Sequence, residues 1–193
     1  MRLGIFGGSF DPPHVGHLLA ATDAVDRLGL DRLVFIPAAT QPLKVGRVGA
    51  AAEHRLAMTR LMVAGEQQFE VSDVEVQRAG LSFTVDTLSH FANRAPADDR
   101  YLLLGADALS LFGQWRSPAE VASLARLAIL QRGDDPPATL PVEVDPARVE
   151  RLPTRRVDVS STEIRERVRV GKSIRGFVTE GVAEYIARHR LYR

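Results

Sequence analysis

The chain has 193 residues, of which 45% are hydrophobic and 25% are charged. This length suits one globular domain with a sizeable buried core, so we expect residues 1–193 to form a single domain. The 25 Lys and Arg residues nearly balance the 24 Asp and Glu residues, which argues against a general nucleic-acid binder or a membrane-surface protein. The sequence contains no cysteine, which excludes disulfide bonds, zinc–thiolate sites and a thiol nucleophile.

Targeting signals are not expected. The chain reaches Gly7 and Gly8 too early to leave room for the apolar region of a signal peptide. No apolar stretch approaches the roughly 18–20 residues that a membrane-spanning helix needs. The sequence therefore predicts a cytoplasmic protein with no membrane partner.

Short apolar runs alternate with longer amphipathic runs along most of the chain. The apolar runs predict strands at residues 3–6, 33–36, 69–76, 101–104 and 128–130, and helical spacing predicts helices at residues 18–28, 53–64, 85–95 and 118–124. Residues 132–153 are polar and rich in proline, which predicts an excursion loop. Beyond this loop we expect a short strand near residues 157–159 and helices at residues 161–170 and 179–189.

This alternation predicts the fold class. Apolar strands that alternate with helices form a parallel sheet covered on both faces, because each crossover helix packs back onto the sheet. We therefore expect a single doubly wound, Rossmann-like α/β domain with a helical C-terminal piece at about residues 160–193. Ligands of such sheets bind beyond the carboxyl ends of the strands, so the residues that follow each strand are the candidate site.

The loop after the first expected strand carries the strongest chemical signal. It reads Gly7-Gly8-Ser9-Phe10-Asp11-Pro12-Pro13-His14-Val15-Gly16-His17. The glycines permit a tight turn with exposed N–H groups, and the two histidines share one face at the start of the next helix. Imidazole donors beside the positive end of a helix dipole favour a phosphate site. An ordinary turn and a metal site remain alternatives, although a zinc site would need a third ligand.

Two motifs together resemble a known superfamily. The stretch from Gly7 to His17 resembles the His/Thr-x-Gly-His signature of the nucleotidyltransferases, and residues 160–165 resemble their second motif, a Ser-Ser/Thr pair that opens a helix. Over nearly the whole chain the sequence is similar to the bacterial nicotinate-nucleotide adenylyltransferases. This resemblance implies that ATP and nicotinate mononucleotide give deamido-NAD and pyrophosphate with Mg²⁺ as cofactor, and that phosphates and water rather than side chains hold the ion.

The resemblance also assigns residues to the two substrates. Three residues would be catalytic, namely His14, His17 and Arg165. The expected ATP-binding residues are these three together with Gly8, Ser9, Phe10, Gly105, Asp107, Ser160 and Ser161. The expected acceptor-binding residues are Ser9, Lys44, Phe83, Thr84, Asp107, Trp115 and Arg132.

The sequence departs from the family pattern at three positions around the expected acceptor. Leu43 stands where His is frequent, Phe83 where Tyr is common, and Arg116 where a second aromatic residue can occur. The preference between nicotinate and nicotinamide mononucleotide therefore stays open at this point. Two other functions also remain open: another nucleotidyltransferase such as phosphopantetheine adenylyltransferase, and a catalytically silent nucleotide-binding domain. We expect no nucleic-acid partner, and a homo-oligomer is left open.

Overall fold

The computed structural model describes residues 1–44, 49–132 and 139–193 of the chain. Its strands are β1 (Arg2–Gly8), β2 (Arg32–Pro37), β3 (Phe69–Val71), β4 (Asp99–Gly105), β5 (Arg126–Arg132) and β6 (Val149–Thr154). Its α-helices are α1 (Val15–Leu28), α2 (Ala52–Met62), α3 (Val74–Arg78), α4 (Thr84–Arg94), α5 (Ala106–Ser110), α6 (Pro118–Leu124), α7 (Ser161–Arg169) and α8 (Glu180–Arg188). Short 3₁₀ turns are η1 (Pro42–Lys44), η2 (Phe112–Gln114) and η3 (Pro146–Arg148).

The strands form one parallel sheet in the order β3-β2-β1-β4-β5-β6. The strand order reverses between β1 and β4, and Ile5 of β1 pairs with Val34 on one side and Leu102 on the other. In doubly wound sheets, ligands bind at the carboxyl ends of the strands near this reversal. The topology therefore places the end of β1 and the end of β4 at the expected binding edge.

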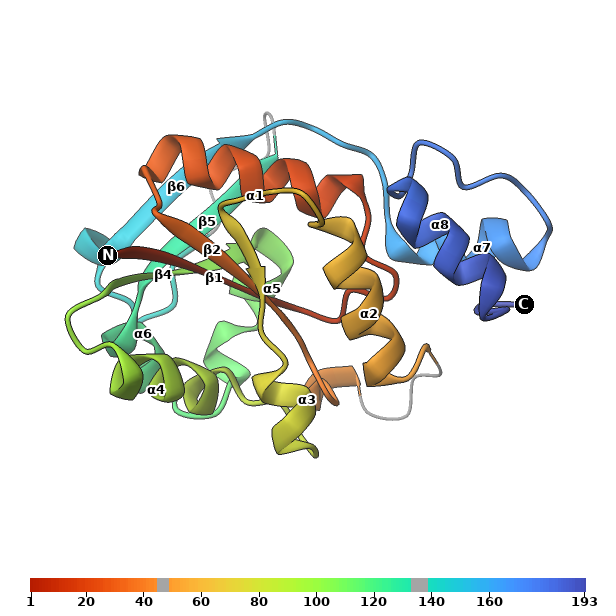
Figure 1. The fold of residues 1–193 in the computed structure, drawn as a ribbon. Helices are drawn as coiled ribbons and strands as arrows, with labels where there is room; N and C mark the ends of the chain where they lie inside the picture. The colour runs from red at the N-terminus through yellow and green to blue at the C-terminus, as the bar shows by residue number, and fades with distance from the viewer. Residues whose placement is uncertain (45–48, 133–138) are drawn as a thin grey trace.

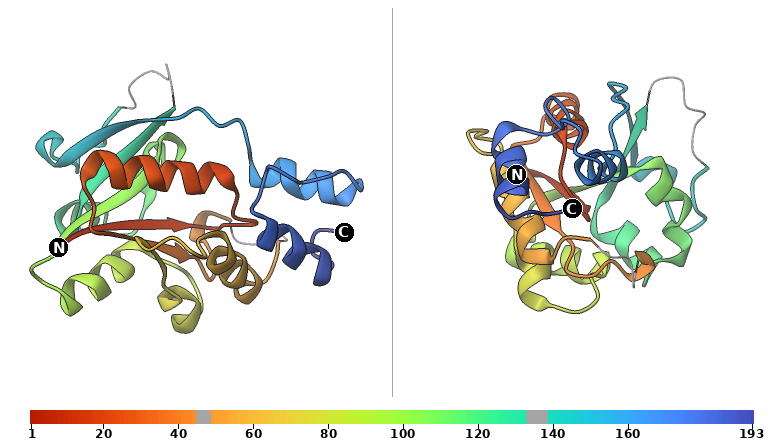
Figure 2. Two further views of the ribbon diagram at one scale, coloured as in Figure 1. Left: turned by 45° about the horizontal axis from the view of Figure 1, so that its top comes forward. Right: turned by 90° about the vertical axis from the view of Figure 1, so that its right-hand side faces the viewer.

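Alternate residues of the central strands enter opposite layers of the core. Phe6 and Leu103 belong to the cluster that α1, α2, α7 and α8 cover, whereas Ile5 and Leu102 belong to the cluster that α4, α5 and α6 cover. Figure 2 shows helices on both sides of the sheet, and Figure 1 shows α7 and α8 beyond the carboxyl ends of the strands. The prediction of a doubly wound sheet with a helical C-terminal piece is confirmed in this arrangement.

Two parts of the element prediction were wrong. The expected strand at residues 69–76 is a strand only over Phe69–Val71, because the chain turns at Ser72 and continues as the short helix α3. The sixth strand lies at Val149–Thr154, inside the expected loop, and not near residues 157–159. β6 is an edge strand that pairs only with β5, and an edge strand tolerates polar residues and a proline such as Pro153.

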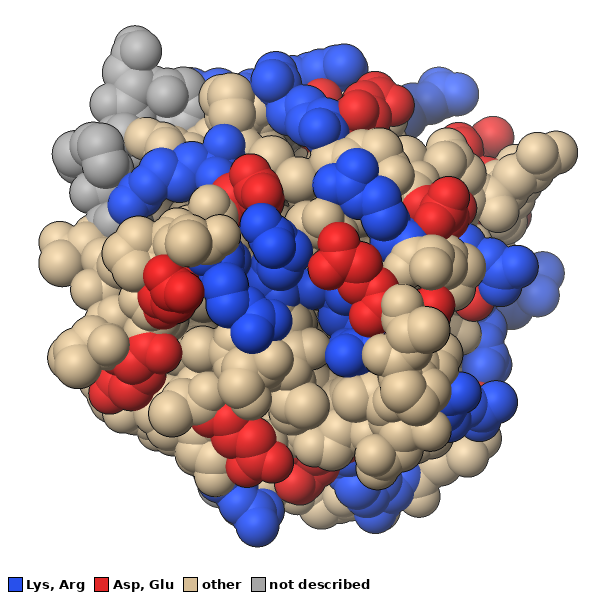
Figure 3. Space-filling model, turned by 90° about the vertical axis from the view of Figure 1, so that its left-hand side faces the viewer, with Lys and Arg blue, Asp and Glu red and all other residues tan. Residues whose placement is uncertain are grey.

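The end of the molecule where the strands begin carries charges of both signs. Figure 3 shows basic and acidic side chains interspersed on this face. Ion pairs lie at the strand starts, between the Met1 amino group and Asp98 (3.2 Å), and between Arg32 and Glu70 (2.7 Å). Within the described part of the chain, no helix is both long and apolar enough to cross a membrane.

Candidate active site at the carboxyl edge of the sheet

Three cavities meet at the carboxyl edge of the sheet. We name each after one lining residue: the Trp115 cavity, the Asp107 cavity and the Arg165 cavity. Gly8 lines both the Trp115 and the Arg165 cavities, Gly105 lines the Trp115 and the Asp107 cavities, and His17 lines the Asp107 and the Arg165 cavities. Gly8 and Gly105 are the last residues of β1 and β4, and His17 lies in the first turn of α1, so the cavities adjoin one another at the strand-order reversal.

The two histidines of the first motif lie at the start of α1. His14 is the N-cap residue and is buried, and its ring centroid lies 3.7 Å from that of His17. The backbone N–H of His14 donates to Nδ1 of His17 over 3.2 Å. Because Nδ1 accepts this bond, a neutral His17 ring carries its proton on Nε2. His17 is thus prepared as a hydrogen-bond donor in two of the cavities.

The glycine between these histidines is explained by the same packing. A Cβ atom on Gly16 would lie 3.1 Å from Nδ1 and Cε1 of the His14 ring. Such a contact is tighter than ordinary van der Waals packing, so a side chain at this position would require the His14 ring to shift. The glycine of the motif therefore lets the two imidazoles stack at the helix start.

The loop that precedes α1 has a fixed and unusual backbone. Phe10 has φ of 49°, in the left-handed region, while its ring is buried. A Cβ atom on Gly8 would lie 2.9 Å from the Phe10 ring, so only glycine allows the ring to pack there. The buried ring anchors the loop, and Ser9 and Phe10 form part of the wall of the Arg165 cavity.

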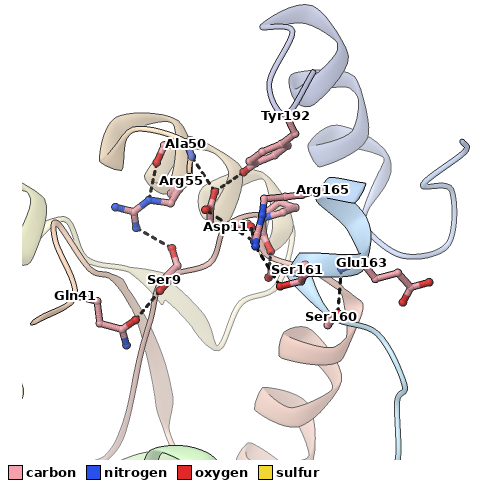
Figure 4. Close-up of polar contacts among 12 residues, drawn as sticks. Ser9, Asp11, Gln41, Ala50, Arg55, Ser160, Ser161, Glu163, Arg165 and Tyr192 are labelled. Carbon is pink, nitrogen blue, oxygen red and sulfur yellow. Dashed lines mark hydrogen bonds and ion pairs between the residues drawn. The ribbon is translucent and has the colours of Figure 1, made fainter. Parts of the chain in front are cut away.

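The second motif opens α7 beside this loop. The Oγ atom of Ser160 caps the helix by accepting from the backbone N–H of Glu163 over 3.1 Å. The hydroxyl of Ser161 has another task, because it donates to the carbonyl of Pro12 over 2.8 Å. The two serines therefore have different roles: Ser160 caps the start of the helix, and Ser161 joins the helix to the first motif (Figure 4).

Arg165 makes a second connection between the motifs. Its Nη1 donates to the backbone carbonyl of Asp11 over 2.7 Å and its Nη2 donates to Oγ1 of Thr162 over 3.1 Å. These bonds use two of the five N–H groups of a guanidinium, and the side chain remains 33% exposed toward the Arg165 cavity. The predicted catalytic residues His17 and Arg165 thus line the same cavity.

Asp11 collects contacts from distant parts of the chain. Its Oδ1 accepts from the hydroxyl of Tyr192 over 2.7 Å and from the backbone N–H of Ala50 over 3.1 Å. Burial and the neighbouring Asp11 carboxylate raise the pKa of Tyr192 well above its usual range, so the phenol remains a donor. The residues just before α2 and the C-terminal segment are therefore both fastened to the first motif.

The expected acceptor residues Phe83, Thr84 and Trp115 line the Trp115 cavity. Phe83 is the N-cap residue of α4 and Thr84 is its first residue. Arg116 places its guanidinium carbon 4.9 Å from the centroid of the Phe83 ring and lies 3.6 Å from Asp86. At the position where the family can carry a second aromatic residue, this chain places a cation at the wall of the cavity.

A buried carboxyl group also lines the Trp115 cavity. Glu75 is buried, and its Oε1 accepts from the hydroxyl of Thr87 over 2.6 Å. The same hydroxyl oxygen accepts from Nη2 of Arg78 over 3.2 Å. Burial raises the pKa of Glu75, partly opposed by the hydrogen bond from Thr87. This network connects α3 to the first turns of α4, where Thr84 lies.

The remaining predicted residues are distributed unevenly. Asp107, Ser160 and Ser161 line the Asp107 cavity with both histidines. Ser9 and Asp107 do not line the Trp115 cavity, so their predicted acceptor contacts stay predictions. The side chains of Lys44 and Arg132 lie outside the described residues.

Sequence reasoning missed four residues of this region, namely Asp11 as an anchor, Arg55, Glu75 and Tyr192. Arg55 could have been found, because it shares the buried face of α2 with Met58 and Met62 at helical spacing. The contacts of Asp11 with Tyr192 join residues 181 positions apart, and no local pattern indicates such a contact.

A resident metal site is not evident from the side chains. Among the residues that the structure describes, no cluster of three or more His, Cys, Asp or Glu side chains could hold a metal ion. The three cavities instead offer imidazole and guanidinium donors, which suit phosphate oxygens.

Comparisons with known proteins identify the family. A model of the cytidylyltransferase-like family matches residues 5–167. A protein of Gemmatimonas aurantiaca named probable nicotinate-nucleotide adenylyltransferase is 52% identical over 197 residues, covering 100% of this chain and 93% of that protein. The chain belongs to the family of nicotinate-nucleotide adenylyltransferases. A Thermus thermophilus protein of the same name is 43% identical over 193 residues, covering 100% of both chains. The family resemblance expected from the two motifs is confirmed.

Solved structures support the fold of this family member. The nicotinic acid mononucleotide adenylyltransferase of Plasmodium falciparum complexed with NaAD has a TM-score of 0.75 at 17% identity, covering 99% of this chain and 97% of that chain. The same enzyme complexed with APC also has a TM-score of 0.75, at 18% identity, with 99% and 96% covered. At these identities the likeness concerns the fold alone, and it confirms the Rossmann-like class.

Proposed function

We propose that the protein transfers the adenylyl group of ATP to nicotinate mononucleotide, giving deamido-NAD and pyrophosphate in NAD biosynthesis. The observation that carries this proposal is the meeting of the two motifs: Ser161 donates to Pro12, and Arg165 joins His17 in one cavity. The Trp115 cavity opens beside it and shares Gly8. The relatives named nicotinate-nucleotide adenylyltransferase supply the choice of acceptor.

The chemistry needs no activated side chain. An oxygen of the mononucleotide phosphate attacks the α-phosphorus of ATP and forms a new P–O bond. The bond between the α-phosphorus and the bridging oxygen to the β-phosphate breaks, and pyrophosphate leaves with that electron pair. The attacking phosphate is already largely ionised near neutral pH, because its second pKa is about 6. The protein therefore has to align two anions and neutralise the charge that develops between them.

The residues that can neutralise this charge come from two helix starts. His17 carries its donor proton on Nε2 because its Nδ1 accepts from His14. Arg165 contributes a permanent positive charge, and the starts of α1 and α7 contribute the positive ends of their dipoles. Donors fixed in advance stabilise charge in a transition state without reorganising. We assign the transition-state contacts to His14, His17 and Arg165.

Mg²⁺ bound to the triphosphate would supply further neutralisation of the phosphate charge. No side-chain cluster of the described residues offers it a resident site. His17 and Arg165 would bind phosphate oxygens, because imidazole N–H and guanidinium groups are hydrogen-bond donors.

The acceptor would occupy the Trp115 cavity. We expect the nicotinate carboxylate near the start of α4 at Thr84, where a helix N-terminus favours an anion. The pyridinium ring would stack on the indole of Trp115, as cations do on aromatic faces. The cation of Arg116 at the cavity wall favours the anionic nicotinate over neutral nicotinamide. A cytoplasmic location and the absence of a nucleic-acid partner remain predictions.

A panel of acceptors tests the proposal. Purified protein is incubated with ATP, Mg²⁺ and one of nicotinate mononucleotide, nicotinamide mononucleotide or phosphopantetheine, and pyrophosphate release is followed. We expect release with nicotinate mononucleotide, slower release with nicotinamide mononucleotide and only background with phosphopantetheine. Release with phosphopantetheine alone would show another nucleotidyltransferase, and release with none would indicate a silent nucleotide-binding domain.

A further inference from the structure

Arg55 is a buried cation that the proposed chemistry does not use. It lies in the first turn of α2 and is only 7% exposed, on the same helix face as Met58 and Met62. No ion pair joins it to a carboxylate within the described residues. Burying a charge is costly unless the group is hydrogen-bonded, so its partners indicate why it is there.

All three of its hydrogen bonds go to backbone carbonyl groups. Nε donates to Ala50 over 3.0 Å, Nη1 donates to Ser9 over 2.7 Å, and Nη2 donates to Ala39 over 2.8 Å. Ala50 precedes α2 itself, Ser9 follows β1 and Ala39 follows β2. Figure 4 shows the bonds to Ala50 and Ser9. We call this set of bonds the Arg55 clamp.

If Arg55 only stabilised the start of α2, the hydrogen bond to the Ala50 carbonyl would be sufficient. The other two bonds reach across to loops at the carboxyl ends of neighbouring strands, and both Ser9 and Ala39 line the Arg165 cavity. The planar fork of a guanidinium fixes the relative position of groups that it bonds, which a flexible ammonium does not. The Arg55 clamp therefore joins these two loops through a rigid group, in addition to the bond from the Ser9 hydroxyl to Gln41 (2.8 Å) and the bond from the Ala38 N–H to the Gly8 carbonyl (2.9 Å).

The clamp also constrains the peptide groups next to the carbonyls that it binds. The peptide between Ser9 and Phe10 is trans, so a fixed Ser9 carbonyl points the Phe10 N–H in the opposite direction. Within the described chain, no hydrogen bond occupies that N–H. On the other loop, the Ala39 N–H donates to Oγ of Ser82 over 2.9 Å, next to Phe83 of the Trp115 cavity. One guanidinium thus touches the loop of the first motif and the loop that supports the expected acceptor residues.

We propose that Arg55 is a positioning residue that holds the ATP loop and the acceptor loop in register, so that the two bound phosphates meet in line. This inference rests on the proposed function. Each loop can still bind its own substrate without the clamp, but misalignment of about 1 Å between reacting groups costs about 100-fold in rate. Loss of the clamp should therefore lower kcat and leave the KM values nearly unchanged.

The test compares Arg55→Met with a matched control, Arg100→Met. Arg100 also donates to two backbone carbonyls, those of Leu124 and Ala95 (3.0 Å each), but at the opposite end of β4. We expect Arg55→Met to lower kcat about 100-fold, with each KM within about threefold of the original protein. Arg100→Met should keep kcat within about threefold. Both are measured where circular dichroism shows the folded state. A kcat of Arg55→Met that matches Arg100→Met, or a loss confined to KM, would overturn the proposal.

A second measurement does not depend on turnover. Hydrogen exchange should rise in peptides covering residues 8–11 and 38–40 in Arg55→Met but not in Arg100→Met, because only the first loses the clamp. Unchanged exchange in both segments contradicts the clamp. If the original protein fails to use nicotinate mononucleotide, the proposed function fails, and the exchange comparison still decides the clamp.

Arg55→Lys serves if Arg55→Met does not fold. It keeps the charge but cannot present the planar fork to three carbonyls. We expect its kcat to lie at least about tenfold below that of the original protein. Full kcat in Arg55→Lys would show that charge alone suffices and would overturn positioning by the fork.

Discussion

At the scale of single residues, the region relies on groups whose hydrogen-bonding roles are already assigned. The His14 N–H occupies Nδ1 of His17, and the Asp11 carbonyl and Thr162 hold Arg165 in place. Such contacts reduce the freedom that the side chains would lose on meeting a phosphate, which is the physical content of preorganisation.

Removal of the His17 imidazole tests its role as a donor. We expect His17→Ala to fold normally and to lower kcat about 100- to 1000-fold, the effect of deleting one preorganised donor to developing charge. The matched control is His90→Ala, because His90 lies within α4 and lines none of the three cavities. Turnover is followed by pyrophosphate release. Nearly normal turnover in His17→Ala would contradict the assigned role.

The buried carboxyl group of Glu75 leads us to predict how the free energy of unfolding depends on pH. Burial raises its pKa in the folded protein, so its contribution to stability is complete below the unfolded pKa of about 4.3 and is lost as pH rises through the folded pKa. Gln cannot ionise and can still accept from Thr87. The free energy of unfolding of Glu75→Gln, relative to the original protein, should therefore increase between about pH 4 and about pH 7.

Urea denaturation at both pH values measures this difference. Glu70→Gln, which removes an exposed carboxylate paired with Arg32, is the control and should change the free energy of unfolding by less than about 1 kcal/mol. A difference for Glu75→Gln that stays constant with pH would contradict the effect of burial.

At the scale of elements, the residues that follow the C-terminal helix connect it to the site. Tyr192 follows α8 and donates to Asp11, whereas Tyr185 within α8 contacts Nδ1 of His54 over 3.0 Å. Both bonds join the C-terminal part of the chain to the rest of the domain. Only the first touches the loop of the first motif.

The two tyrosines therefore form a matched pair of variants. We expect Tyr192→Phe and Tyr185→Phe each to lower the free energy of unfolding by about 1–2 kcal/mol, the usual cost of one such hydrogen bond. Tyr192→Phe should also lower kcat about three- to tenfold, because Asp11 loses a contact that positions the loop. Urea denaturation and steady-state kinetics provide the two measurements. Equal kcat values for the two variants would contradict a role of the Tyr192–Asp11 hydrogen bond in catalysis.

The elements also show what the sequence could and could not predict. β1, β2, β4 and β5 are buried in the sheet and read as continuous apolar runs, so periodicity locates them. β3 and β6 are edge strands whose mixed composition resembles a turn or a loop.

The same division holds for the site. His14, His17, Ser160 and Ser161 stand in two local motifs at helix starts, and the structure places them around one cavity. The roles of Arg55, Asp11 and Tyr192 depend on which loops the fold brings together. Tertiary packing decides such contacts, and no short window of sequence contains them.

At the scale of the whole molecule, a near-neutral chain is compatible with two highly charged substrates. The net charge is +1, and basic and acidic side chains are interspersed at the end of the molecule where the strands begin. Cationic and N–H donors for phosphate gather at the other end, where β1 and β4 finish and α1 and α7 start. We therefore propose that phosphate recognition is a local property of the strand-order reversal.

A competition reaction tests the central claim most directly. The protein receives ATP and Mg²⁺ with equal concentrations of nicotinate mononucleotide, nicotinamide mononucleotide and phosphopantetheine, and mass spectrometry quantifies the adenylylated products. Their initial ratio gives the ratio of kcat/KM values, in which about 1.4 kcal/mol of discrimination corresponds to tenfold. We predict deamido-NAD as the dominant product. Dominance of dephospho-coenzyme A, or consumption of ATP without any adenylylated acceptor, would contradict the claim.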